Sequence, residues 1–450
     1  MDRAAALSPV RTDLALLLKL SWPVVLSRLG IMAMGLTDAV VVGRYSAEQL
    51  GFHALAWAPA SVVVTMAIGL LTGVQVMAAR AVGEGRLHQT GAVLRRGLSY
   101  SLWIGLVSGL AVALAGPPFL HSIGLDPGLA AGASGPILVF ALSLPGYAIS
   151  VAASFWLEGL ARPGPGAWAM WAANVVNLAL VLLLVPGAWG LPAMGAIGAA
   201  WATTGARSFL AVVMLIYIAR MSEARALGVF DKPERDRAAE AEQRRIGFGA
   251  GASNFFEVAA FASMNLIAGW ISGLAVAAWA VVLNVTAIVF MVPLGFSTAA
   301  AVLVGRAYGA RDEAGVRRAG LLAFAMTAIF GVVVSVAIWP LAAPIVGGYT
   351  ADPRTIALAV PALVLACVMF TPDALQVVIA QALRARGEVW TPTAIHLMSY
   401  VLVMMPLAWW LAIPCGLAVQ GIVWGVIIAS VISMALLGAR FWVLSRRGLG

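Results

Sequence analysis

Residues 275–304 read AVAAWAVVLNVTAIVFMVPLGFSTAAAVLV and contain no charged side chain. An α-helix needs about 20 consecutive apolar residues to cross the hydrocarbon core of a bilayer. In a soluble domain a segment this long would leave apolar surface in water, whereas in a membrane lipid covers it. The stretch therefore predicts a membrane-spanning helix.

The composition of the whole chain agrees with that interpretation. Of 450 residues, 62% are hydrophobic and only 10% are charged, whereas soluble domains have about 25% charged residues. Strands of a membrane barrel would be only about ten residues long, so the predicted fold is an all-α polytopic membrane protein. The apolar segments predict twelve transmembrane helices, at residues 14–42, 54–79, 97–116, 129–155, 167–187, 195–219, 247–269, 275–304, 319–342, 355–382, 391–412 and 419–443.

Arginine and lysine lie almost entirely in alternate loops, and the opposite loops hold only Arg44 and Arg354. Loops rich in these residues stay in the cytoplasm, so we expect a multi-pass protein of the bacterial inner membrane with both termini cytoplasmic. The net charge of +9 is then an orientation signal. Nucleic-acid binding would require a basic soluble face with interleaved aromatic residues, and we expect no nucleic-acid partner.

One internal offset of 226 residues aligns the two halves of the chain. It pairs Gly43 with Gly269, Ser46 with Ser272, Gly69 with Gly295, Arg80 with Arg306, and Asp126-Pro127 with Asp352-Pro353. Each half holds six predicted helices, so the halves have the same orientation and are related by a parallel pseudo-two-fold repeat. We expect an N-lobe at 1–219, a charged cytoplasmic linker at 220–246 and a C-lobe at 247–450. Parallel repeats of this kind occur in secondary transporters, which bind substrate near the membrane midplane.

The chain lacks the sequence pattern of a nucleotide-driven motor. That pattern requires a lysine directly after a glycine, and the only lysines, Lys19 and Lys232, do not follow one. The two cysteines and four histidines are scattered, so we expect no cofactor. A gradient of Na⁺ or H⁺ is therefore the expected source of energy.

Three carboxylates lie within predicted spans: Asp38, Glu257 and Asp373. A charge at membrane depth costs at least about 2.5 kcal/mol, which makes each acid a candidate functional residue. At about 1.5 Å of rise per residue, Glu257 and Asp373 lie about 16–18 Å from the cytoplasmic edge, and Asp38 lies about 9 Å from the outer edge. We expect Glu257 and Asp373 to exchange the coupling ion or proton, and Asp38 to tune or gate the outer half. An acid pair that only packs helices together is the alternative.

Soft, aromatic and amide side chains flank the two matched acids at helical spacing. Methionine and aromatic faces suit ligands that are both apolar and positively charged. They therefore predict a pocket for amphipathic organic cations, although helix packing is the ordinary alternative for any single one. The residues are Phe261, Met264, Met369 and Gln376.

At these residues the sequence resembles the multidrug and toxic compound extrusion (MATE) family, over nearly its whole length. The most specific match is Pro372-Asp373-Ala374-Leu375-Gln376, followed by Ala382-Leu383-Arg384. The remaining matches include Gly35-Leu36-Thr37-Asp38, Gly73-Val74-Gln75, Glu257, Pro293-Leu294-Gly295 and Val304-Gly305-Arg306.

The resemblance implies two six-helix lobes that alternate access across the membrane and export organic cations in exchange for Na⁺ or H⁺. Glu257 and Asp373 imply the NorM-type branch, whose cation site lies in the second lobe, and would be its Na⁺ ligands. Phe290 matches an aromatic position that faces a bound cation there. The chain departs from relatives at Val181, where some carry an acid, and at Arg28, Ala280 and Met369.

The sequence alone leaves two rival functions open. A flippase or exporter of a lipid-linked or metabolite substrate would need a wide basic cavity, for which Arg28 and Arg207 are the only support. An intramembrane enzyme would use the two acids for hydrolysis, but no nucleophile–base pair or metal-ligand cluster accompanies them. We expect a monomeric antiporter of small organic cations, and not an enzyme.

Overall fold

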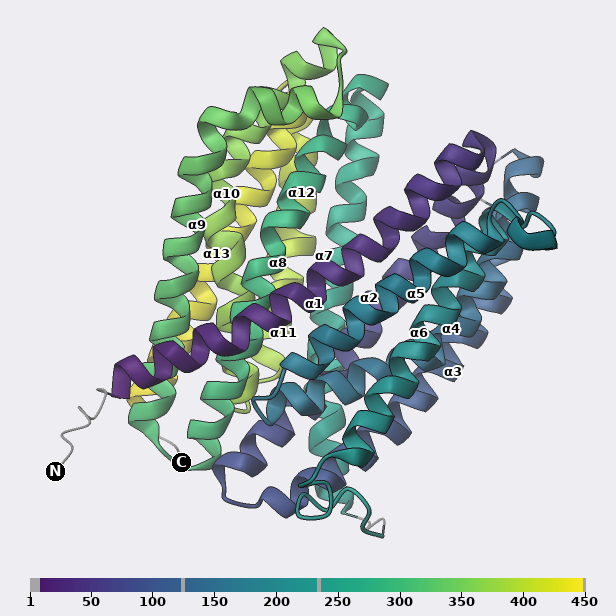
Figure 1. Cartoon of the computed structure of the whole chain (residues 1–450). Coiled ribbons are helices and arrows are strands. Elements are labelled where there is room, and N and C mark those ends of the chain that lie inside the picture. Colours follow the sequence, from purple (N-terminus) through teal and green to yellow (C-terminus); the bar gives the residue numbers. More distant parts are fainter. Residues whose placement is uncertain (1–8, 123–125, 233–235, 448–450) are drawn as a thin grey trace, which may run out of the picture. The chain divides into compact units, whose positions relative to one another are not determined.

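The computed structural model describes residues 9–122, 126–232 and 236–447 (Figure 1). Over these residues it contains twelve helical segments that are long and apolar enough to cross a membrane. The same residues contain no strand. The prediction of an all-α polytopic membrane fold is therefore confirmed.

The first half contains six long helices and two short 3₁₀ turns, η1 (Leu87–Gln89) and η2 (Ala188–Gly190). Its long helices are α1 (Pro9–Tyr45), α2 (Ala47–Gly83), α3 (Thr90–Ser122), α4 (Pro127–Gly159), α5 (Gly164–Leu184) and α6 (Gly195–Arg220). The second half contains α7 (Arg237–Ile271), α8 (Gly273–Gly309), α9 (Glu313–Tyr349), α10 (Pro353–Ala385), α11 (Trp390–His396), the π-helical η3 (Leu397–Met404), α12 (Met405–Ala412) and α13 (Ala418–Arg447). The segments α11, η3 and α12 together form one span.

Equivalent helices in the two halves begin with the same capping residues. Ser46 caps α2 and Ser272 caps α8, each accepting a hydrogen bond from the backbone N–H three residues on, at 3.4 and 3.0 Å. Asp126 caps α4 and Asp352 caps α10, and a proline follows each of them in the first turn. Such caps satisfy N–H groups that the helix itself leaves unpaired. The 226-residue offset therefore aligns structurally equivalent helix starts.

Contacts divide the chain into two compact units, and the division passes through α1 and α7. One unit is Leu26–Gly251, and the other combines Ala252 onward with the described residues up to Val25. The first part of each half's first helix thus packs with helices of the other half. In addition, residues 237–246 of the expected linker are helical and form the first turns of α7.

Glycines permit the close packing of α1 and of α7 against helices of the other half. A Cβ on Gly69 of α2 would lie 2.5 Å from the Cα of Gly251 of α7. At the equivalent position of α8, a Cβ on Gly295 would lie 2.9 Å from the carbonyl oxygen of Ser21 of α1. Only glycine lets two helix backbones approach this closely, so α1 and α7 make matching contacts within their respective units.

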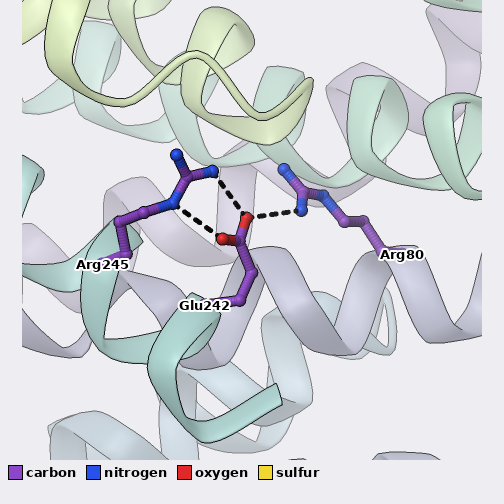
Figure 2. A network of polar contacts seen from close by, with 3 residues as sticks. All are labelled: Arg80, Glu242 and Arg245. Carbon is purple, nitrogen blue, oxygen red and sulfur yellow. Dashed lines mark hydrogen bonds and ion pairs between the residues drawn. The ribbon is translucent and has the colours of Figure 1, made fainter. Parts of the chain in front are cut away.

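Ion pairs also hold the first turns of α1 and α7 against their neighbours. Figure 2 shows Glu242 of α7 between two arginines: Arg245 donates to it at 2.7 and 3.1 Å, and Arg80 of α2 donates at 3.3 Å. In the other unit, Arg318 of α9 pairs with Asp13 of α1 at 2.5 Å. The first turns of both α1 and α7 are therefore held by ion pairs as well as by close backbone packing.

Candidate functional site

Asp373 of α10 lies at the centre of a buried polar cluster in the second half. It is 5% exposed, and its Oδ1 accepts hydrogen bonds from Gln376 Nε2 at 2.8 Å and from Ser430 Oγ of α13 at 3.2 Å. The Gln376 amide also donates to the Tyr400 hydroxyl of η3 at 3.0 Å. Within the described part of the chain, Oδ2 accepts no hydrogen bond, so it is available to a cation or a proton.

Glu257 of α7 belongs to the same cluster. It is partly buried, and it lies close enough to Asp373 for the charges of the two carboxylates to interact. Among the residues that the structure describes, none donates a hydrogen bond to its carboxylate. The two acids of the predicted pair are thus brought together, and each keeps free acceptor capacity.

Arg384 adds a buried positive charge to the two acids. It is 3% exposed, it donates to Ser253 Oγ of α7 at 2.7 Å, and its charge interacts with that of Glu257. His396 of α11 lies beside Tyr400, with 5.4 Å between the ring centroids. The cluster therefore holds one fixed cation next to two carboxylates, an arrangement that the position of Arg384 near a helix end did not reveal in the sequence.

The predicted substrate residues fall into two groups. Phe261 and Phe290 are partly exposed and remain candidates for ligand contact. Met264 and Met369 are 0% and 1% exposed within the packed core, which is the position that the packing alternative describes. Gln376 is 0% exposed as well, and it orients the acid and the tyrosine hydroxyl described above.

Asp38 of α1 lines a cavity of about 220 Å³ in the unit Leu26–Gly251. The carboxylate is 2% exposed, and its Oδ2 accepts a hydrogen bond from Thr203 Oγ1 of α6 at 2.5 Å. Asn177 of α5 lies beside it, and Val181, one turn further along, is fully buried. Among the described residues that line this cavity, no second acid completes a carboxylate pair, so Asp38 differs from the pair in the other unit.

Glu158 of α4 is a buried acid that lies outside the predicted spans. It is 6% exposed and accepts a hydrogen bond from Gln75 Nε2 of α2 at 2.6 Å. Its charge interacts with that of Arg28, whose guanidinium carbon lies 5.6 Å from the ring centroid of Phe155. Hydropathy places the end of this span at residue 155, whereas α4 continues to Gly159. The signal that points to Glu158 is its partner Gln75, which belongs to one of the matched motifs.

Comparison with known proteins gives one match in each half: the MatE family model covers residues 23–183 and 250–410. The chain is 63% identical to the probable multidrug resistance protein NorM of Caulobacter vibrioides, over 98% of this chain and 93% of that protein. It is 29% identical to the multidrug resistance protein PmpM of Pseudomonas aeruginosa, over 90% of this chain and 84% of that protein. The eukaryotic MATE transporter AtDTX14 is similar in fold, with a TM-score of 0.88 at 17% identity, over 98% of this chain and 99% of that one.

Proposed function

Because the chain belongs to the MatE family of multidrug efflux transporters, we propose that it exports amphipathic organic cations in exchange for Na⁺ or H⁺. The relatives compared above are named as multidrug resistance proteins and a MATE transporter, and not as enzymes, so the enzyme alternative is set aside. We place the exchange at Glu257 and Asp373, with alternating access to the two sides of the bacterial inner membrane.

The observation that carries this proposal is the charge of the cluster around Asp373. With both acids ionised, Glu257 and Asp373 contribute two negative charges and Arg384 one positive charge, so the cluster has a net charge of −1. One Na⁺, one H⁺ or one monovalent organic cation restores neutrality. A second cation would leave a buried charge without a counter-charge, which costs several kcal/mol in a low-dielectric interior. Coupling ion and substrate therefore compete for one place, as antiport requires.

The surrounding groups suit both competitors. Alkali cations prefer hard oxygen ligands. The cluster supplies them from Glu257, Asp373, Ser430 and Tyr400. Phe261 supplies an aromatic face that attracts an organic cation and packs on its apolar body. The same cluster can thus hold either a small inorganic cation or a larger lipophilic cation, but not both at once.

The basic residues do not favour the flippase alternative. Arg207 shares its cavity with Asp38, and the charge of Arg28 interacts with that of Glu158. Each arginine on which a basic cavity would depend therefore has an acid nearby. The charges of these described residues support exchange of cations more than recognition of a polyanionic lipid.

Transport by reconstituted protein tests the proposal. Vesicles with an imposed Na⁺ or pH gradient should drive ethidium movement, and Glu257→Gln and Asp373→Asn should each slow it at least about tenfold, because each removes a charge-assisted contact. Met404→Leu, a volume-conserving change at a fully buried core residue, is the control and should transport normally. Ethidium movement that ignores both gradients would overturn antiport, and coupling retained in both acid variants would overturn the site.

A further inference from the structure

The last turns of α2 and α8 carry equivalent arginines, but only the first of them meets an acid. The 226-residue offset pairs Arg80 of α2 with Arg306 of α8. Arg80 donates to Glu242 of α7, to which Arg245 also donates (Figure 2). The side chain of Arg306 forms no hydrogen bond or ion pair with the described residues, although its Nε is buried. An unpaired buried donor costs about 1–3 kcal/mol, so a partner for Arg306 would stabilise this end of α8.

An apolar residue and a second cation replace the acid and the arginine of α7. By the same offset, Glu242 corresponds to Leu16 of α1 and Arg245 corresponds to Lys19. Lys19 is exposed, and like Arg306 it forms no ion pair within the part of the chain that the structure describes. Two cations that an acid joins in the first half are therefore left without one in the second.

The packing of α1 against α8 supports this equivalence. A Cβ on Gly295 of α8 would lie 2.5 Å from Cγ2 of Val25 of α1. The offset pairs these two residues with Gly69 and Gly251, where a Cβ on Gly69 would lie 2.5 Å from the Cα of Gly251. Within its own unit, α1 thus approaches α8 at the same residues at which α7 approaches α2. Positions that the offset aligns in α1 and α7 are equivalent in the fold as well.

The turn after α8 adds a third cation on a strained backbone. The N–H of Arg311 donates to the carbonyl oxygen of Tyr308 at 3.0 Å, and Gly85 makes the same bond to Val82 after α2, at 3.1 Å. The angle φ is 55° at Arg311 and 72° at Gly85. Glycine adopts this conformation freely, whereas it costs other residues about 1–2 kcal/mol. An arginine at a position that suits glycine indicates that its side chain has a function.

The acids near this turn are engaged elsewhere. Asp312 caps α9 and accepts a hydrogen bond from an N–H of its first turn at 2.9 Å. The charge of Glu313 interacts with that of Arg386. Asp13 of α1 pairs with Arg318 at 2.5 Å. The three cations described above are therefore open to an anion from outside the chain.

The face of α1 that carries Lys19 is exposed on a segment long and apolar enough to span the membrane. Trp22, one turn after Lys19, is 63% exposed, and Leu18 is 44% exposed. Lysine and tryptophan near the end of a membrane helix lie at the level of the lipid headgroups. In the expected orientation this end faces the cytoplasmic leaflet, whose anionic lipids attract basic residues.

We propose that Lys19, Arg306 and Arg311 bind the phosphate headgroup of an anionic lipid of the cytoplasmic leaflet. An arginine fork donates two parallel N–H bonds to phosphate oxygens, and a lysine adds a point charge. The phosphate supplies the negative charge that Glu242 supplies in the first half. A lipid bound there holds the first turns of α1 against α8, just as the ion pairs in Figure 2 hold α7 against α2. This inference goes beyond the cation exchange proposed above, since it involves neither the acidic cluster nor the substrate.

Thermal melting of the purified full chain in a neutral detergent tests the inference. Dioleoylphosphatidylglycerol should raise the midpoint, because a ligand that binds only the folded state stabilises it. Dioleoylphosphatidylcholine and inorganic phosphate should leave the midpoint unchanged. Arg306→Gln should weaken the apparent affinity for phosphatidylglycerol, measured from the concentration dependence of the midpoint, at least about tenfold. An equal effect of the two lipids, or an equal effect of inorganic phosphate, would overturn the inference.

Matched variants separate lipid binding from folding. Leu16→Glu restores the acid of the other half, so it should remove the response to phosphatidylglycerol without lowering the midpoint measured without lipid. Arg311→Gly should also reduce the response, yet raise the lipid-free midpoint because it relieves the strained backbone. Arg220→Gln removes an exposed arginine from α6 and should respond as wild type does. Wild-type responses of folded Leu16→Glu and Arg306→Gln would overturn the inference.

One further variant separates this inference from the antiport proposal. Glu257→Gln should lose gradient-driven ethidium exchange while its midpoint still responds to phosphatidylglycerol as that of wild type does. Loss of the lipid response in Glu257→Gln would place the lipid at the acidic cluster and overturn the separate site. Retention of both ethidium exchange and the lipid response would contradict the antiport site alone.

Discussion

Asp373 is oriented by donors from two helices, and both bonds end on the same oxygen. Gln376 reaches Oδ1 from its own helix α10, and Ser430 reaches it from α13. Because the second oxygen receives no bond from the described residues, the donors fix the direction of the carboxylate without occupying its binding face. The contribution of such a donor to stability can be measured separately from transport.

Ser430→Ala should destabilise the protein by about 1.5–3 kcal/mol, because it removes a buried hydrogen bond to a charged group. Ser433→Ala is the matched control: it lies on the same helix, is equally buried, and its hydroxyl has no partner among the described residues. Melting in detergent should therefore show a lower midpoint for Ser430→Ala and an unchanged or higher one for Ser433→Ala. Equal shifts in the two variants would contradict the hydrogen bond to Asp373.

At this scale the sequence identified the acids and Gln376, but not the hydroxyl groups that contact them. Asp38, Glu257 and Asp373 stand out because charge is rare within apolar segments, and burial of Asp38 and Asp373 follows from their position there. Ser430 and Tyr400 carry no such signal, since hydroxyl groups are common in membrane helices and hydrogen-bond readily to their own backbone. Which hydroxyl meets which carboxylate depends on how helices pack, and no single helix encodes that.

The connection between α10 and α11 is short, and polar contacts fix it to the end of α13. Glu388 accepts hydrogen bonds from Thr391 Oγ1 at 2.8 Å and from Arg440 Nη2 at 2.7 Å. Arg386 donates to the carbonyl oxygen of Leu444 at 2.7 Å. These contacts join the ends of helices that carry Asp373 and Ser430, so the connection supports the geometry of the cluster from a distance.

Stability at this connection should depend on pH. Burial raises the pKa of Glu388, but the bonds from Arg440 and Thr391 outweigh it and hold the pKa below its ordinary value of 4.5. The bonds therefore stabilise the fold fully above pH 4.5, and the contribution is lost as pH falls below that value. Glu388→Gln should lower stability by about 1 kcal/mol at pH 7, since the pair is partly exposed.

The difference between Glu388→Gln and wild type should shrink as pH falls below 4.5. Melting curves at several pH values check this, with Glu48→Gln, a change at an exposed acid of α2, as the control that removes a charge without removing a connection. A difference that stays constant down to low pH would show that the loss does not come from the ionised carboxylate.

At the scale of elements, the number and kind of helices followed from hydropathy, but their ends did not. The apolar span 54–79 belongs to α2, which begins at Ala47, and the span 247–269 belongs to α7, which begins at Arg237. The extra turns of α7 rest on ion pairs, and those of α2 begin at the Ser46 cap, neither of which hydropathy reports. The π-helical stretch η3 could not be predicted from the sequence either, because a change from i→i+4 to i→i+5 hydrogen bonds leaves the composition unchanged.

The orientation of the whole chain is open to a test with its own cysteines. Cys415 is exposed in the turn between α12 and α13, whereas Cys367 is buried. If both termini are cytoplasmic, an even number of spans places that turn on the outer side of the membrane. Native Cys415 then reports the orientation without any engineered site.

A membrane-impermeant maleimide should label right-side-out vesicles before they are permeabilised, because Cys415 faces the added reagent. Cys415→Ser should abolish the labelling, and inverted vesicles should be protected until they are opened. Labelling that requires permeabilisation of right-side-out vesicles would reverse the proposed orientation. Cys367, which is 3% exposed, should stay unlabelled in the folded protein in either case.

The packing of the first part of α1 and of α7 with helices of the other half affects how the chain is assembled. The segment of α1 before Leu26 packs with helices that begin after residue 251, so it leaves the ribosome long before its partner Gly295 exists. Likewise, the helices α2 to α6 must wait for the first turns of α7. Neither unit can be completed from one continuous piece of nascent chain, and we expect final assembly only after the translocon has released the second half.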